Sequence, residues 1–185
     1  MTHQHTSALH GKALLAAMTG GADCSALRHA NFDGCALTAF PREALHAREL
    51  LSLSFFDNQL TEVPAEVGEL HALRTLNFGG NLLTTLPASI GTLAQLEMLD
   101  LGHNRLSAVP ESLGALQRLV FLYLSNNQLR ELPESLAALS ALRYLNVTDN
   151  QFEALPNWIG RLANLLELRV YNNALTHLPE ELGAL

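Results

Sequence analysis

The chain has 185 residues and is 48% hydrophobic, which is sufficient for one folded domain. Its formal net charge of −7 is spread along the chain, so we expect neither a nucleic-acid partner nor a membrane surface as partner. Two cysteines are too few for a disulfide framework and no apolar stretch is long enough for a membrane span or a signal peptide, which favours a cytoplasmic location.

The first predicted element is a helix over residues 7–19, which Gly20 terminates. Leu14 and Met18 lie on one face of this helix. Because the first unit of a stacked array otherwise exposes an apolar edge, we expect residues 1–26 to form a tail and an N-terminal capping helix.

The remainder, residues 27–185, repeats with a period of 23 residues. The repeating unit reads L-x-x-L-x-L-x-x-N-x-L-x-x-L-P-x-x-L-G-x-L, and seven units fit, the first of which is degenerate with Cys35 in place of the asparagine. The recurring asparagines are Asn58, Asn81, Asn104, Asn127, Asn150 and Asn173. A fixed period of this length indicates a repeat architecture that forms one domain.

This unit resembles the leucine-rich repeat family, and its L-P-x-x-[IL]-G-x-L ending is similar to the Ras-group type and to repeats of bacterial proteins. The resemblance implies an α/β repeat fold: a right-handed solenoid with a concave parallel β-sheet and short convex helical or 3₁₀ segments. It also implies a recognition surface rather than a catalytic one. The basic residues, 10 arginines and 1 lysine, favour a GC-rich bacterial genome.

The alternation in L-x-L is the pattern of a strand with one apolar face, which a single 23-residue unit cannot bury alone. Identical neighbours bury it by stacking, so the strands are expected to lie parallel, about 4.8 Å apart. Each recurring asparagine falls where the chain turns out of the strand. Its amide can satisfy backbone groups that the turn leaves unpaired, so we expect a buried, structural asparagine ladder.

Positions 3, 5, 7 and 8 of each unit point outward, and parallel strands place them side by side on the concave face. Met98, Phe121 and Tyr144 occupy position 3 of consecutive units, and Tyr123 lies two residues from Phe121, which predicts one contiguous aromatic patch. The candidate partner-binding residues are Phe56, Met98, Asp100, Phe121, Tyr123, Tyr144, Asn146, Arg169 and Tyr171. The alternative is that these side chains pair across strands only to stabilise the sheet.

No catalytic or cofactor-binding motif occurs in the sequence, so we expect no enzyme activity, no cofactor and no metal site. Asp57, His103 and Asp149 share position 8 of their units but lie two units apart. At one strand per unit this corresponds to about 10 Å between neighbours, which is too far for shared ligation or proton transfer.

The sequence therefore predicts a protein–protein interaction module that binds a protein or peptide on the concave sheet. The alternative is the substrate-targeting half of a larger bacterial enzyme or secreted effector, whose kinase or ubiquitin-ligase domain lies outside this chain and which acts in a host cell. The last unit ends at Leu185 without a cap, which suggests a longer chain or self-association through that uncapped repeat.

Overall fold

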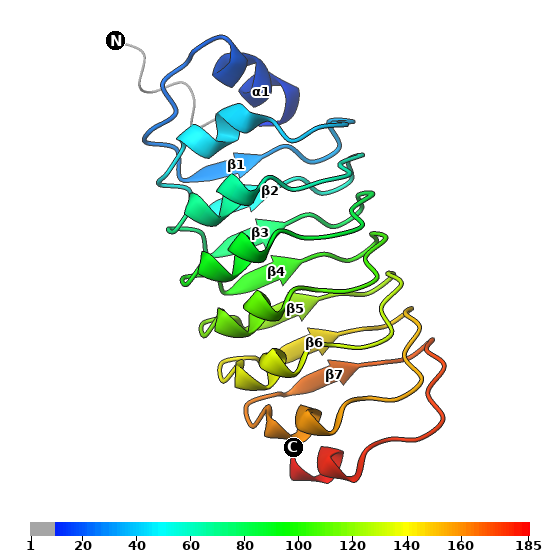
Figure 1. Cartoon of the computed structure of the whole chain (residues 1–185). Helices are drawn as coiled ribbons and strands as arrows, with labels where there is room; N and C mark the ends of the chain where they lie inside the picture. Colours follow the sequence, from blue (N-terminus) through cyan, green and yellow to red (C-terminus); the bar gives the residue numbers. More distant parts are fainter. Residues whose placement is uncertain (1–9) are drawn as a thin grey trace.

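One parallel sheet runs the length of the molecule in the computed structural model, which describes residues 10–185 (Figure 1). In this part of the chain the sheet has seven strands in sequential order: β1 (His29–Asn31), β2 (Ser52–Ser54), β3 (Thr75–Asn77), β4 (Met98–Asp100), β5 (Phe121–Tyr123), β6 (Tyr144–Asn146) and β7 (Glu167–Arg169). Each strand pairs with the next at a register of one repeat, so that Met98 lies opposite Phe121. The right-handed solenoid with an open, curved sheet is confirmed.

The alternation within each strand separates core from surface. The central residue is buried in six of the seven strands, as Leu76, Leu99 and Leu122 show, whereas its two neighbours face outward. Directly after the strands, the rings of Phe32, Phe55 and Phe78 stack inside the solenoid, with centroids 5.0 and 5.6 Å apart. The apolar half of each unit therefore forms one continuous core along the stack.

Short 3₁₀ helices form the opposite, convex side, and a proline with φ between −73° and −64° directly precedes each one. They are η2 (Arg42–His46), η3 (Ala65–Glu69), η4 (Ala88–Thr92), η5 (Glu111–Ala115), η6 (Glu134–Ala138), η7 (Asn157–Arg161) and η8 (Glu180–Ala184). The expected convex segments are thus 3₁₀ helices, one for each repeat.

The convex stack is not uniform, because the residue at position 19 sets how closely successive 3₁₀ helices approach. Gly91 and Gly114 lie against the backbone of the next helix, leaving no room for a side chain. Leu45 and Ala137 occupy this position at two other junctions, and there the helices pack less closely. At the second of these junctions the buried side chain of Trp158 belongs to the following helix.

Helix α1 (Gly11–Thr19) packs on the first repeat, where it contacts β1 and η2 and buries Leu14 and Met18. Gly20 is its C-cap, as expected. The expected start at residue 7 is wrong, because His10 is extended, with a φ of −143°, and the helix begins one residue later. Residues 7–9 lie outside the described part of the chain.

Candidate functional site

The asparagine ladder holds the repeats together. Nδ2 of Asn127 donates to the carbonyl oxygens of Leu101 and Leu124 at 3.0 and 3.1 Å, and its Oδ1 accepts the backbone N–H of Leu106 at 2.9 Å. Leu101 and Leu106 belong to the preceding repeat, so one side chain links two units. The asparagines at this position are buried in five repeats, as expected. Asn173 is half-buried, because it belongs to the last described repeat and nothing stacks on its outer side.

Position 8, which precedes the ladder asparagine in six units and Cys35 in the first, requires a left-handed backbone. Its φ lies between 53° and 67° in all seven units. The residues there are Gly34, Asp57, Gly80, His103, Asn126, Asp149 and Asn172. Glycine, asparagine, aspartate and histidine adopt this conformation more readily than other residues. The left-handed backbone therefore explains why Asp57, His103 and Asp149 recur with the repeat period. Within residues 10–185 no group of three or more His, Cys, Asp or Glu side chains is placed to hold a metal ion.

Position 5 has a second structural role that sequence reasoning missed. In four repeats an Asn or Asp side chain there accepts the backbone N–H two residues ahead, and the acceptors are Asn31, Asn77, Asp100 and Asn146. The recurrence of Asn and Asp at this position is the signal that predicts such a turn. Asn146 is only 9% exposed, so we leave it out of the proposed contact surface.

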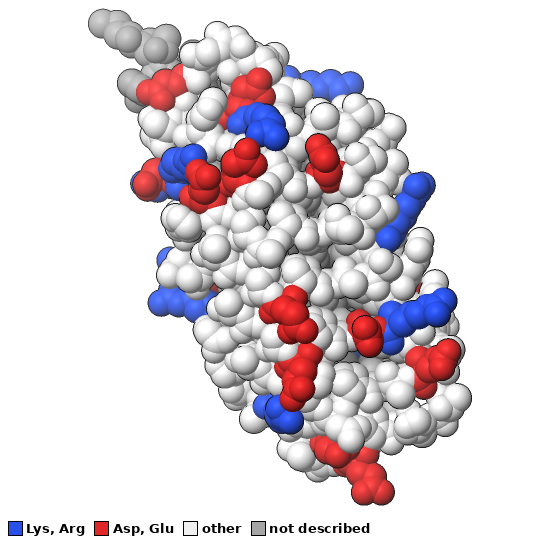
Figure 2. Space-filling model, viewed as in Figure 1, with Lys and Arg blue, Asp and Glu red and all other residues white. Residues whose placement is uncertain are grey.

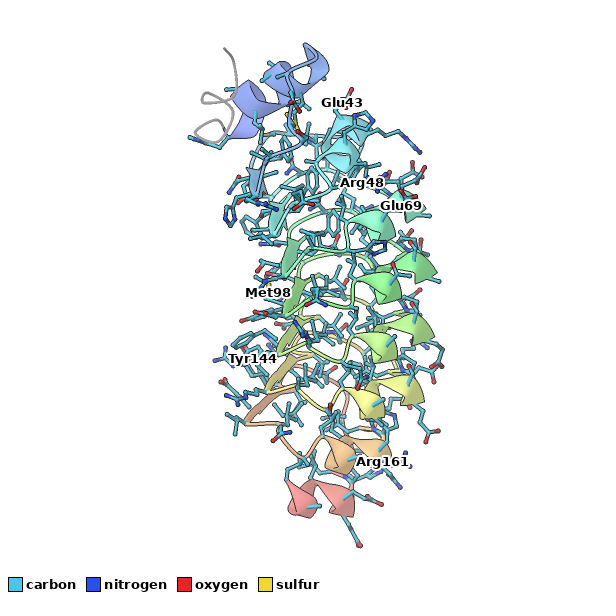
Figure 3. All side chains as sticks on the ribbon, turned by 90° about the vertical axis from the view of Figure 1, so that its left-hand side faces the viewer. Glu43, Arg48, Glu69, Met98, Tyr144 and Arg161 are labelled. Carbon is cyan, nitrogen blue, oxygen red and sulfur yellow. The ribbon has the colours of Figure 1, made fainter. Side chains whose placement is uncertain are left out.

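The aromatic residues on β5 and β6 form a cluster on the outer face of the sheet, which we call the aromatic patch and define as Phe121, Tyr123 and Tyr144. The Tyr144 ring lies 4.9 Å from the Tyr123 ring and 6.3 Å from the Phe121 ring, with interplanar angles of 40° and 44°. Phe121 is 42% exposed, and both tyrosines are half-buried. Figure 3 shows Met98 and Tyr144 on the side of the molecule opposite Glu69 and Arg161.

Arg169 borders the aromatic patch on β7. Its guanidinium carbon lies 5.4 Å from the centre of the Tyr144 ring, within the range of a cation–π interaction. Its Nε donates to Glu167 at 2.6 Å, and this hydrogen bond raises the pKa of Arg169. The cation on this side of the patch is therefore already paired with a carboxylate and a ring.

Asp100 borders the patch on the opposite side, on β4, in register with Tyr123. Burial raises the pKa of Asp100 above its ordinary value, although its hydrogen bond from Gly102 and the nearby His103 act in the other direction. The pKa of Tyr123 is also raised, chiefly by burial and by its neighbours Tyr144 and Asp100. This side of the patch is therefore acidic and partly removed from water, and we call Asp100 and Tyr123 the acidic corner.

Two further candidates, Phe56 and Tyr171, lie apart from the patch. The Phe56 side chain packs over the backbone of Gly79 and Gly80 in the next repeat, and 45% of it remains exposed. Tyr171 follows β7 and is 59% exposed. Neither ring is in contact with Phe121, Tyr123 or Tyr144, so these residues extend the outer face without belonging to its centre.

The opposite face carries charged side chains of both signs, interspersed as Figure 2 shows. Several of them pair between neighbouring repeats, for example Arg48 with Glu69 at 2.6 Å and Arg161 with Glu134 at 3.1 Å. Such exposed pairs contribute about 0.2–1 kcal/mol each. No helix within residues 10–185 has the length and apolar character needed to cross a membrane.

The geometry defines the chain as a repeat solenoid with one exposed sheet face. Residues 51–141 and 93–185 match the family model for the leucine-rich repeat region, and the chain therefore belongs to the leucine-rich repeat family. Members of this family are typically non-catalytic interaction modules. A search of curated proteins found no match.

Solved structures support this assignment. A leucine-rich repeat protein of Leptospira interrogans superposes with a TM-score of 0.83 at 37% identity, over 85% of this chain and 40% of that one. The plant peptide hormone receptor RGFR1 in complex with RGF2 superposes with a TM-score of 0.77 at 32% identity, over 86% of this chain and 27% of that one.

The ectodomain of the Arabidopsis thaliana receptor kinase GASSHO1/SCHENGEN3, in complex with CASPARIAN STRIP INTEGRITY FACTOR 2, superposes with a TM-score of 0.70 at 29% identity. This match covers 80% of this chain and 19% of that one. The chain thus spans 40% or less of the length of each of these structures. Two of the three structures, those of RGFR1 and of GASSHO1/SCHENGEN3, are complexes with a second component.

Proposed function

We propose that the chain binds a protein or peptide partner on its concave sheet, with the aromatic patch at the centre of the contact. The proposal rests on the exposure of Phe121 beside Tyr123 and Tyr144, on a sheet face that no other element within residues 10–185 covers. Parallel sheets are normally covered on both faces. Tyrosine, phenylalanine and methionine are enriched in the cores of protein interfaces, so the patch has the composition of a binding surface.

Related structures support a partner of this kind. RGFR1 is solved in complex with RGF2, and GASSHO1/SCHENGEN3 with CASPARIAN STRIP INTEGRITY FACTOR 2. We infer by similarity that a peptide or an extended protein segment lies across the strands of this chain. Large, rigid aromatic side chains bind such segments with little loss of side-chain entropy, because each has only two rotatable bonds.

Selection of a displayed random 12-residue peptide library on the immobilised chain tests the proposal. Peptides that bind should lose about tenfold or more in affinity to the Phe121→Ala and Tyr144→Ala variants, as expected for residues at the centre of an interface. Leu178→Ala is the matched control, because Leu178 is 59% exposed but lies in the last repeat, outside the patch. Peptides that bind all three variants equally would refute a contact at the patch.

We also propose that the chain has no catalytic activity of its own, that it is bacterial and that it is cytoplasmic. The alternative, in which these repeats direct an attached kinase or ligase to its substrate, concerns sequence outside this chain.

Self-association through the last repeat is a separate proposal. The exposed leucines of this repeat are Leu166, Leu178 and Leu185. Light scattering across a concentration series tests whether the chain associates.

A further inference from the structure

The aromatic patch has a carboxylate on each side, and only one of the two forms an ion pair. On β7, Glu167 is paired with Arg169, whose guanidinium also covers the Tyr144 ring. On β4, Asp100 forms no ion pair with any basic side chain of residues 10–185. The only hydrogen bond to its side chain within this part of the chain is from the N–H of Gly102 to Oδ1.

The unpaired carboxylate is also partly removed from water. Asp100 is half-buried, and burial is the largest contribution to its raised pKa. A charge taken out of water is unfavourable unless an opposite charge or hydrogen bonds compensate it. Oδ2 accepts no hydrogen bond from residues 10–185, and the nearby His103 favours the charged form without forming an ion pair with it. A cationic group from outside would therefore improve the electrostatics of this corner.

The aromatic rings beside Asp100 also lack a cationic partner. Arg169 over Tyr144 is the one cation–π contact within the described residues, and no cation lies over Phe121 or Tyr123. Tyr123 is in register with Asp100 on the adjacent strand, about 4.8 Å away along the sheet. A carboxylate and a ring therefore lie together without the guanidinium that completes the equivalent group on β7.

The dimensions of this corner suit one long basic side chain. Met98 is in register with Phe121, and Asp100 with Tyr123, so these four residues form a quadrilateral on β4 and β5. Residues i and i+2 on one strand lie about 7 Å apart, which is close to the length of a lysine or arginine stem. Methionine and phenylalanine at one end and aspartate and tyrosine at the other match an aliphatic stem followed by a charged head.

We propose that an arginine or lysine side chain of a peptide partner binds here, with its head between Asp100 and the Tyr123 ring and its stem along Met98 and Phe121. This inference rests on the proposed function and specifies its partner as a basic segment. The net charge of −7 agrees with it, since an acidic protein attracts basic segments over a distance and electrostatic complementarity selects among partners.

The test uses the peptides selected from the displayed library. Selected sequences should be enriched in arginine or lysine, and replacing the critical residue by citrulline or norleucine should reduce affinity about tenfold or more. The Asp100→Asn variant should bind the unmodified peptide correspondingly less well and should no longer distinguish it from the neutral one. Asn keeps the acceptor for Gly102, because Asn77 makes the same bond to Gly79.

Asp57→Asn is the matched control, because Asp57 is exposed, lies outside the patch and occupies a left-handed position that asparagine tolerates. This variant should still discriminate the charged peptide from the neutral one. Peptides that require Phe121 and Tyr144 but bind Asp100→Asn and the neutral analogue undiminished would overturn the cation site and leave the proposed function standing. Peptides that require neither ring would overturn both.

Discussion

Gly114 and Ser135 meet so closely between η5 and η6 that a β-carbon on Gly114 would lie 2.4 Å from the carbonyl oxygen of Ser135. Since that oxygen belongs to the backbone, the clash cannot be relieved by rotating a side chain. Gly114→Ala is therefore expected to force the two repeats apart and to reduce the free energy of unfolding by about 1–3 kcal/mol. Urea denaturation followed by circular dichroism measures this loss.

The control for this substitution lies at the same position of the last repeat. A β-carbon on Gly183 would meet no other segment of residues 10–185 within 4 Å, because no further 3₁₀ helix packs on η8 in this part of the chain. Gly183→Ala should change the free energy of unfolding by no more than about 0.5 kcal/mol, as for a surface substitution. Equal losses in the two variants would show that helix propensity, and not the contact between repeats, causes the effect.

The asparagine ladder leads to a second prediction. Asn127→Ala removes the side chain that joins two repeats. It leaves the N–H of Leu106 without a partner and the carbonyl of Leu101 with only its hydrogen bond from Asn104. Unpaired buried polar groups cost about 1–3 kcal/mol, so the urea midpoint should fall accordingly. Asn173→Ala, at the half-buried end of the ladder, should cost less. An unchanged midpoint for Asn127→Ala would contradict the structural role of the ladder.

The sheet side of this fold was predictable from the sequence because its rules repeat with the 23-residue period. The L-x-L alternation buries Leu122 and turns Phe121 and Tyr123 outward, and the asparagine position follows from the turn it must stabilise. These are local relationships within a unit, and the period simply copies them along the stack. The contacts of Tyr144 with Phe121 and Tyr123 follow from the same register.

The convex side was less predictable, because its spacing depends on pairs of residues in different repeats. Ala137 replaces glycine in one unit and Trp158 fills the facing site in the next, and only the stacked structure shows that the junction opens there. Burial at position 5 also differs with the neighbouring strands. The buried Asn146 lies between Tyr123 and Arg169, whereas the half-buried Asp100 lies between Asn77 and Tyr123.

A third prediction separates a binding surface from a purely structural pairing of the aromatic rings. Because Phe121 is 42% exposed, Phe121→Ala should reduce the free energy of unfolding by less than about 1 kcal/mol, the range for cross-strand pairs. Phe78→Ala, at a fully buried ring stacked on Phe55, should cost about 3–5 kcal/mol. A loss for Phe121→Ala as large as that for Phe78→Ala would favour the structural explanation of the patch.

The last prediction concerns the dependence of stability on pH. Burial raises the pKa of Asp100 in the folded state above its ordinary value of 3.8, so the folded state holds this proton more tightly than the unfolded state does. Stability therefore falls as pH rises from below 3.8 through the raised folded-state pKa, and the loss is complete once the pH exceeds that pKa. Asp100→Asn removes this loss while keeping the acceptor for Gly102.

Thermal unfolding of the wild type and the variant at pH 3 and pH 7 measures the effect. Asp100→Asn should raise the Tm at pH 7 and change it much less at pH 3, where the wild-type carboxyl is protonated in both states. Asp100→Ala is the control, because it also loses the hydrogen bond to Gly102 and should destabilise the protein relative to Asp100→Asn at both pH values. If Asp100→Asn instead lowered the Tm at pH 7, Asp100 would stabilise the free protein, and an unpaired charge awaiting a cationic partner would be the wrong description of this site.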